Sequence, residues 1–177
     1  TYGSAAPGTM SINASARQLA EPQFTGEVAE ALRDSGLPAD RLTIEITETT
    51  ILELGASVTN LTALRSMGIR IALDDFGAGY TSFSYLKKLQ ADAIKIDGAL
   101  IKDMLANQTN IAIVRTIVEL ARSLGMKTIA EWAEDSGTVE TLAEIGVDYV
   151  QGFAVARPQD PARIISEYGP AHACTMR

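Results

Sequence analysis

The chain has 177 residues, 46% of them hydrophobic, which is long enough to bury one substantial globular core. Its formal net charge of −7 argues against binding long nucleic acids, because few cations remain to neutralise a ladder of phosphates. A single cysteine excludes a disulfide framework and a thiolate zinc cluster, and the only histidine, His172, lies in the polar tail after Pro170, which argues against a Ser-His-Asp site. The sequence has neither a membrane-length apolar run nor a signal-peptide pattern, so we expect no membrane contact by this segment.

Short runs rich in β-branched residues alternate with longer amphipathic stretches along the whole chain. Strands are predicted at residues 10–13, 42–47, 69–74, 93–97, 127–131 and 147–151. Helices are predicted at residues 27–35, 56–67, 111–124, 136–145 and 161–168. This rhythm is typical of repeated βα units around a parallel sheet, so the predicted fold class is α/β.

The predicted strands share one feature: a polar side chain near the C-terminal end. In the strand at 42–47, for example, Glu45 shares a face with two threonines, whereas the aliphatic residues lie on the other face. In a β/α barrel the active site forms at this rim, from residues on different strands. The rim residues are Asn13, Glu45, Asp74, Asp75, Lys95, Glu131 and Gln151. Any one of them could be a capping residue, but several converging charges favour a bound cation, which would relieve their repulsion.

The acidic and amide residues of this rim offer only oxygen ligands, which Mg²⁺ and Mn²⁺ prefer. Asp74 and Asp75 would point to opposite faces of a regular strand, so we expect the strand to end at about Asp74 and turn at Gly77 and Gly79. Both carboxylates could then reach neighbouring ions. Two ions roughly 4 Å apart can activate a water and stabilise the leaving oxygen of a phosphodiester.

Lys95 has three interpretations: a residue that positions an attacking water at a metal site, a Schiff-base lysine of an aldolase-like barrel, or a structural ion pair. A Schiff-base amine needs a lowered pKa. Nearby carboxylates would keep Lys95 charged, which makes the aldolase interpretation the weaker one.

Five motifs resemble the EAL phosphodiesterase family in order and spacing. They are NASARQ at 13–18, EITE at 45–48, DDFGAGYTS at 74–82, KID at 95–97 and QGF at 151–153. The resemblance extends from about Met10 to Pro158. It implies a TIM-type (β/α)8 barrel of the EAL kind, here incomplete at the N-terminus with six βα units. Residues 1–177 are then a single EAL-type domain that is truncated at its N-terminus.

The resemblance also implies an activity, the metal-dependent hydrolysis of cyclic di-GMP to linear pGpG with Mg²⁺ or Mn²⁺ in a two-metal site. By motif position, one metal has the ligands Asn13, Glu45 and Asp74, whereas Asp75 and Glu131 belong to the second metal or the water. Lys95, Glu131 and Gln151 take the catalytic positions. The remaining positions are Arg17, Gln18, Arg157 and Pro158 for substrate binding, and Glu48 as the anchor of the aspartate loop.

The chain departs from the family in ways that affect the metal site. The family begins with two strands and a helix that carry the glutamate of the Glu-Ala-Leu signature, a metal ligand, and these are absent. The tripeptide 30–32 has the same letters but lies in an amphipathic helix ending at Gly36, where Glu30 should face solvent. Trp132 replaces a family glycine beside Glu131, where it could distort the loop, cover the rim or stack on a guanine.

The implied partners are cyclic di-GMP, a second copy in a homodimer, and an upstream sensor or GGDEF-type domain, with a cytoplasmic location. The alternative is a catalytically inactive cyclic di-GMP receptor or regulatory interaction module. The missing strand and Trp132 favour that alternative, because the loss of an oxygen ligand weakens metal binding and exposed sheet edges invite pairing with another chain.

Overall fold

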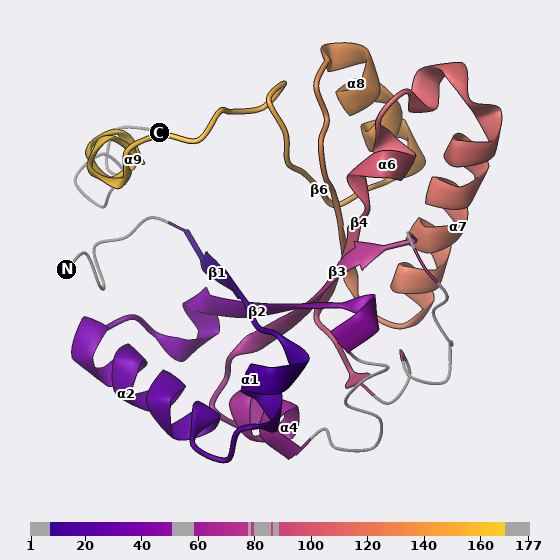
Figure 1. Cartoon of the computed structure of the whole chain (residues 1–177). Coiled ribbons are helices and arrows are strands. Elements are labelled where there is room, and N and C mark those ends of the chain that lie inside the picture. The colour runs from indigo at the N-terminus through magenta and orange to yellow at the C-terminus, as the bar shows by residue number, and fades with distance from the viewer. Residues whose placement is uncertain (1–7, 51–58, 78, 80–85, 87–88, 169–177) are drawn as a thin grey trace.

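The computed structural model describes residues 8–50, 59–77, 79, 86 and 89–168. Within these residues, six parallel strands form one sheet whose order follows the chain. The strands are β1 (Met10–Asn13), β2 (Leu42–Thr47), β3 (Arg70–Phe76), β4 (Ala93–Ile96), β5 (Lys127–Ala130) and β6 (Tyr149–Val150). They curl into part of a barrel with β1 and β6 at its edges (Figure 1). The α/β prediction and the incomplete barrel are thereby confirmed.

Helices lie along the outer side of the curled sheet (Figure 1). They are α1 (Ala16–Ala20), α2 (Phe24–Ser35), α4 (Thr59–Ser66), α6 (Gly98–Ile101), α7 (Gln108–Ser123) and α8 (Ser136–Ile145). The last helix, α9 (Pro161–Tyr168), lies apart from the sheet (Figure 1). The five predicted helices are present, although residues 56–58 of the second lie outside the described residues. The short helices α1 and α6 were not predicted, because four or five residues carry too little periodicity to detect. No helix in the described part of the chain is both long and apolar enough to cross a bilayer.

The core lies between the sheet and the outer helices, as the strand alternation predicts. The aliphatic residues of the central strands, among them Ile44, Ile71 and Ile94, are fully buried. On the helical side Val114 and Ile117 of α7 belong to the same cluster. Burying these side chains turns the polar residues of the same strands to the opposite face, which is the inner face of the barrel.

The end of β3 differs from the prediction. The strand does not stop at Asp74 but continues to Phe76. Its register with β4 shifts between Leu73 and Phe76, so β3 accommodates the aspartate pair in a bulge. Asp75 takes a left-handed conformation there, with φ of 54°. A bulge, rather than the end of the strand, therefore brings two consecutive carboxylates to the rim.

At the opposite end of β5 and β6, Asp148 ties the two strands together. Its carboxylate accepts hydrogen bonds from the Thr128 N–H at 2.9 Å, the Thr128 hydroxyl at 3.0 Å and Lys127 Nζ at 2.6 Å. Burial alone would raise the pKa of Asp148, but these hydrogen bonds outweigh burial and hold the pKa below its usual value of 3.8.

Replacing Asp148 by asparagine should therefore lower the free energy of unfolding, on the order of 1 kcal/mol at neutral pH. Because the folded pKa is lowered, the charged form stabilises the fold above the unfolded pKa of 3.8, and this stabilisation disappears as the pH falls through the lower folded pKa. Urea unfolding should show a constant difference in the free energy of unfolding between the wild type and Asp148→Asn down to about pH 4.5. Below pH 3.8 this difference should become smaller. A difference that does not depend on pH would contradict this account.

Candidate functional site

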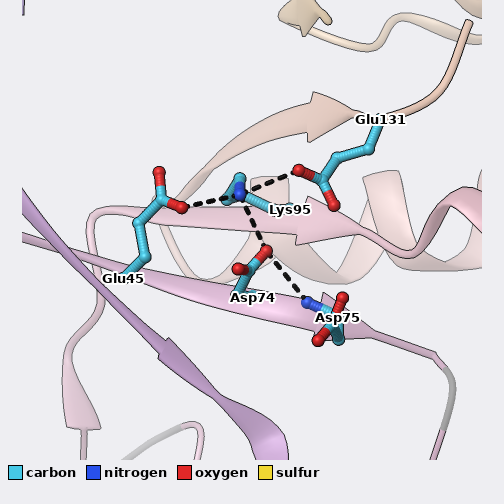
Figure 2. Close-up of polar contacts among 5 residues, drawn as sticks. All are labelled: Glu45, Asp74, Asp75, Lys95 and Glu131. Carbon is cyan, nitrogen blue, oxygen red and sulfur yellow. Dashed lines mark hydrogen bonds and ion pairs between the residues drawn. The ribbon is translucent and has the colours of Figure 1, made fainter. Parts of the chain in front are cut away.

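Lys95 lies at the centre of a buried polar cluster on the inner face of the sheet. Its ammonium Nζ is 2.7 Å from Glu45 Oε2, 2.8 Å from Asp74 Oδ1 and 2.8 Å from Glu131 Oε1. Figure 2 shows the three carboxylates converging on this one nitrogen. Lys95 is only 5% exposed, and Glu45 and Glu131 are 9% exposed. One lysine thus partly neutralises three acidic groups in a place that water barely reaches.

Each member of the cluster comes from a different strand, in line with the alternation read from the sequence. Glu45 is in β2, Asp74 is in the bulge of β3, Lys95 is in β4, and Glu131 directly follows β5. Adjacent parallel strands place these side chains along one rim, because residues two apart on a strand share a face. The structure therefore brings together four of the predicted site residues.

The contacts of Lys95 distinguish among its possible roles. Burial alone would lower the pKa of Lys95, but the hydrogen bonds to Asp74, Glu131 and Glu45 outweigh burial and hold the pKa above its ordinary value. The amine is therefore protonated at neutral pH. A Schiff-base mechanism needs the free amine, so this environment opposes an aldolase-like role.

A second group of carboxylates adjoins this cluster and has the arrangement of a cation site. Asp74, Asp75 and Glu131 each offer an oxygen, and these oxygens lie within 4.8 Å of one another. Burial and the neighbouring Asp74 raise the pKa of Asp75. Burial also raises the pKa of Glu131, although the hydrogen bond from Lys95 opposes the increase. Crowded, partly desolvated carboxylates attract a cation, and an all-oxygen set fits a hard divalent ion.

Two predicted metal ligands lie outside this group of three. Glu45 directs its carboxylate to Lys95, as described above. Asn13 is exposed at the end of β1 and pairs in register with Glu45. The strand order thus places Asn13 on the same rim, one strand beyond Glu45.

The predicted substrate-binding and anchoring residues have different surroundings. Arg17 is exposed on α1, where the side-chain oxygen of Gln18 accepts hydrogen bonds from the N–H and hydroxyl of Ser15 and so closes a capping box. Glu48 is buried directly after β2, and both of its carboxylate oxygens lack a hydrogen-bond partner among the described residues. A side chain at Gly79, in the aspartate loop, would lie 3.2 Å from Glu48 Oε1. The buried carboxylate of Glu48 therefore lies beside that loop.

The false Glu-Ala-Leu tripeptide behaves as the sequence predicts. Glu30 lies within α2, is exposed and pairs with Arg33 at 3.3 Å. Gly36 ends the helix in a left-handed conformation, with φ of 71°. The tripeptide is thus far from the inner face of the sheet and contributes no ligand.

A cleft of about 600 Å³ opens beside Glu131 and brings together three of the remaining predicted site residues. Its lining includes Trp132, Gln151, Phe153, Arg157 and Pro158. The Arg157 guanidinium lies over the Phe153 ring, 4.5 Å from its centre. Phe153 was not among the predicted site residues, although it belongs to the QGF motif at 151–153.

The sequence of this chain is similar to a known protein family and to several curated proteins. The family model of the EAL domain matches residues 3–158. The cyclic di-GMP phosphodiesterase PdeB of Shewanella oneidensis is 35% identical over 90% of this chain and 19% of its own length. The chain spans about a fifth of the length of the curated relatives it matches.

Two solved structures are similar in fold and in sequence. The EAL domain of Mycobacterium smegmatis DcpA has a TM-score of 0.83 at 32% identity, covering 90% of this chain and 72% of that one. Klebsiella pneumoniae BlrP1, solved as a complex with manganese and cyclic di-GMP, has a TM-score of 0.77 at 34% identity and covers 82% of this chain and 38% of that one.

Proposed function

Since the chain belongs to the EAL domain family, we propose that it hydrolyses one phosphodiester of cyclic di-GMP to give linear pGpG. The observation that carries this proposal is the buried, charged Lys95 next to a cluster of three carboxylates that fits a divalent cation. PdeB is named a cyclic di-GMP phosphodiesterase, and BlrP1 was solved with manganese and cyclic di-GMP. Both relatives support the proposed substrate, and BlrP1 also supports a divalent metal.

The proposed metal ligands are Asp74, Asp75 and Glu131, together with Glu45 and Asn13 on the neighbouring strand ends, and the proposed ions are Mg²⁺ or Mn²⁺ in a two-metal site. When bound, such ions would supply a water activated for attack and charge that stabilises the leaving oxygen. The protein contributes a fixed set of oxygens on one rim, held by four strands. The burial of Glu45 and Glu131 strengthens the charge interactions that these two residues make.

Lys95 is the proposed positioning group for the attacking water. Its protonated ammonium has three N–H groups, and three carboxylates lie within 2.8 Å of it, so Lys95 would have to exchange one of these contacts to donate a hydrogen bond to the water. Gln151, which lines the cleft beside Glu131, is proposed to contact the same water or the scissile phosphate. Neither residue needs to change its protonation state for these roles.

Substrate binding is proposed to use Arg17 and Gln18 on α1 and Arg157 and Pro158 in the cleft. The two arginines offer positive charge to the phosphates of an anionic ligand. Glu48 is proposed to hold the aspartate loop in place. We further propose that the chain acts in the cytoplasm, as a homodimer, together with an upstream sensor or GGDEF-type domain.

The direct test is chromatographic detection of pGpG after incubating the purified chain with cyclic di-GMP and Mg²⁺ or Mn²⁺. Glu131→Gln should lower the rate by about 100-fold or more, because it removes a carboxylate from both the cation cluster and the Lys95 cluster. Glu140→Gln, the same substitution at an exposed site on α8, should leave the rate unchanged. Failure to form pGpG with either metal would refute hydrolysis by this chain.

A second candidate function is a non-catalytic cyclic di-GMP receptor. The observation that favours it is that Lys95 by itself partly neutralises Glu45, Asp74 and Glu131, an arrangement that holds together without a cation. Equilibrium dialysis in the presence of a chelator distinguishes the two. Binding without a metal, combined with no product when metal is added, would support the receptor over the enzyme.

A further inference from the structure

Trp132 has an unusual conformation for a large aromatic residue. Its φ is 57°, in the left-handed region that side chains other than glycine, asparagine and aspartate seldom occupy. Such a conformation is strained and persists only where the surroundings impose it. Trp132 is nevertheless 59% exposed, so burial of the indole in the core does not explain the strain.

One contact does fix the position of the indole. A side-chain carbon added at Gly98, the first residue of α6, would lie 2.8 Å from Cε3 of Trp132 and closer still to Cγ and Cδ2. The ring therefore packs directly on the Gly98 backbone, in space that any larger residue would fill. Gly98 is itself buried, so this support is part of the folded core.

The loop that carries Trp132 is joined to the loop that carries Phe153. The Gln151 N–H donates to Ala130 O at 2.8 Å, the Ala133 N–H donates to Gln151 O at 3.2 Å, and the Ala154 N–H donates to Ala133 O at 2.9 Å. These three backbone hydrogen bonds hold the two loops side by side. Trp132 and Phe153, both more than half exposed, consequently line the same cleft.

We propose that Trp132, supported by Gly98, is a substrate-contacting residue on which one purine base of cyclic di-GMP stacks in this cleft; the proposal rests on the proposed function. Exposed aromatic rings bind nucleobases through their faces, and the volume of the cleft is within the usual range for a small-molecule site. Trp132 directly follows Glu131, so a base on the indole lies next to a carboxylate of the cation cluster. The Arg157 guanidinium, which lies over the Phe153 ring, adds positive charge to the same cleft.

The chain contains one tryptophan, so its fluorescence reports on residue 132 alone when tryptophan is excited selectively. Titration with cyclic di-GMP should quench this emission, with the same Kd that equilibrium dialysis measures.

Trp132→Gly should weaken binding by about 5- to 150-fold, as expected for the loss of one base–aromatic stack. Glycine adopts the left-handed conformation without steric strain, so this variant should fold at least as well as the wild type. Tyr149→Ala removes an aromatic ring that is also 59% exposed but does not line the cleft, and it should bind normally.

A double-mutant cycle distinguishes a stacking surface from a merely structural residue. Gly98→Ala should displace the indole and weaken binding in the wild type, but should change little in the Trp132→Gly background, where no ring is left to displace.

The possible outcomes separate the two proposals. If dialysis shows binding without fluorescence quenching, and Trp132→Gly has the same Kd as the wild type, the role of Trp132 is overturned and the proposed substrate remains intact. No binding of cyclic di-GMP by the wild type would overturn both proposals. Quenching and weakened binding without pGpG formation would support Trp132 and refute hydrolysis.

Discussion

Replacing Lys95 by methionine should lower the free energy of unfolding by about 3–5 kcal/mol when no divalent cation is present. The substitution keeps most of the volume but removes the cation that Glu45, Asp74 and Glu131 share. Removing one partner of a buried ion pair lowers stability more than replacing all partners with apolar residues, because the remaining charges stay desolvated and repel one another. For a chain of this size the loss corresponds to a fall in Tm of roughly 6–20 °C.

Urea unfolding of the metal-free proteins measures this effect. Lys127→Met is the matched control, since Lys127 is exposed and forms a surface ion pair with Asp148, and its loss should change stability much less. Added Mg²⁺ should restore more stability to Lys95→Met than to the wild type, because the cation would replace the missing positive charge. Equal effects of the two lysine substitutions would show that the cluster is solvated and that Lys95 is not its counter-ion.

Replacing Gly152 by alanine should disrupt the cleft and lower stability by about 2–4 kcal/mol. An added Cβ would lie 2.8 Å from the carbonyl carbon of Ala133 and closer still to its nitrogen and oxygen. These are backbone atoms held by hydrogen bonds between the two loops, so they cannot rotate away as a flexible side chain would. The loops must separate, which moves Gln151 and Phe153 away from Trp132 and should weaken the binding of cyclic di-GMP together with stability.

Gly26→Ala provides the control for this second substitution. Gly26 lies within α2, and an added Cβ there would meet no atom within 4 Å. Alanine at that position should be neutral or should stabilise the helix by about 0.5–1 kcal/mol. Thermal unfolding should therefore show a loss of stability for Gly152→Ala and none for Gly26→Ala, and dialysis should show weaker binding of cyclic di-GMP for Gly152→Ala alone. A Gly152→Ala variant with wild-type stability would show that the two loops are less closely joined than their hydrogen bonds indicate.

The amino-acid sequence by itself determined the alternation of strands and helices and the polar residue near the end of each strand. Both are local properties, because the spacing of apolar and polar residues along the sequence directly shows the period of two of a strand or of 3.6 of a helix. The position of Glu30 on a solvent-exposed helix, and hence its exclusion from the site, followed from the same periodicity and is confirmed.

Only the tertiary structure decided how the polar ends meet. Lys95 and Glu45 are 50 residues apart, and whether they touch depends on strand register and on the curl of the sheet, which no local pattern encodes. The bulge that accommodates Asp74 and Asp75 was missed for a similar reason, since an extra residue in β3 is defined only by its partner strand. The packing of Trp132 on Gly98 likewise joins a loop to the start of α6 through space. Sequence periodicity therefore predicted which residues face the rim, whereas strand register and packing decided which of them form the site.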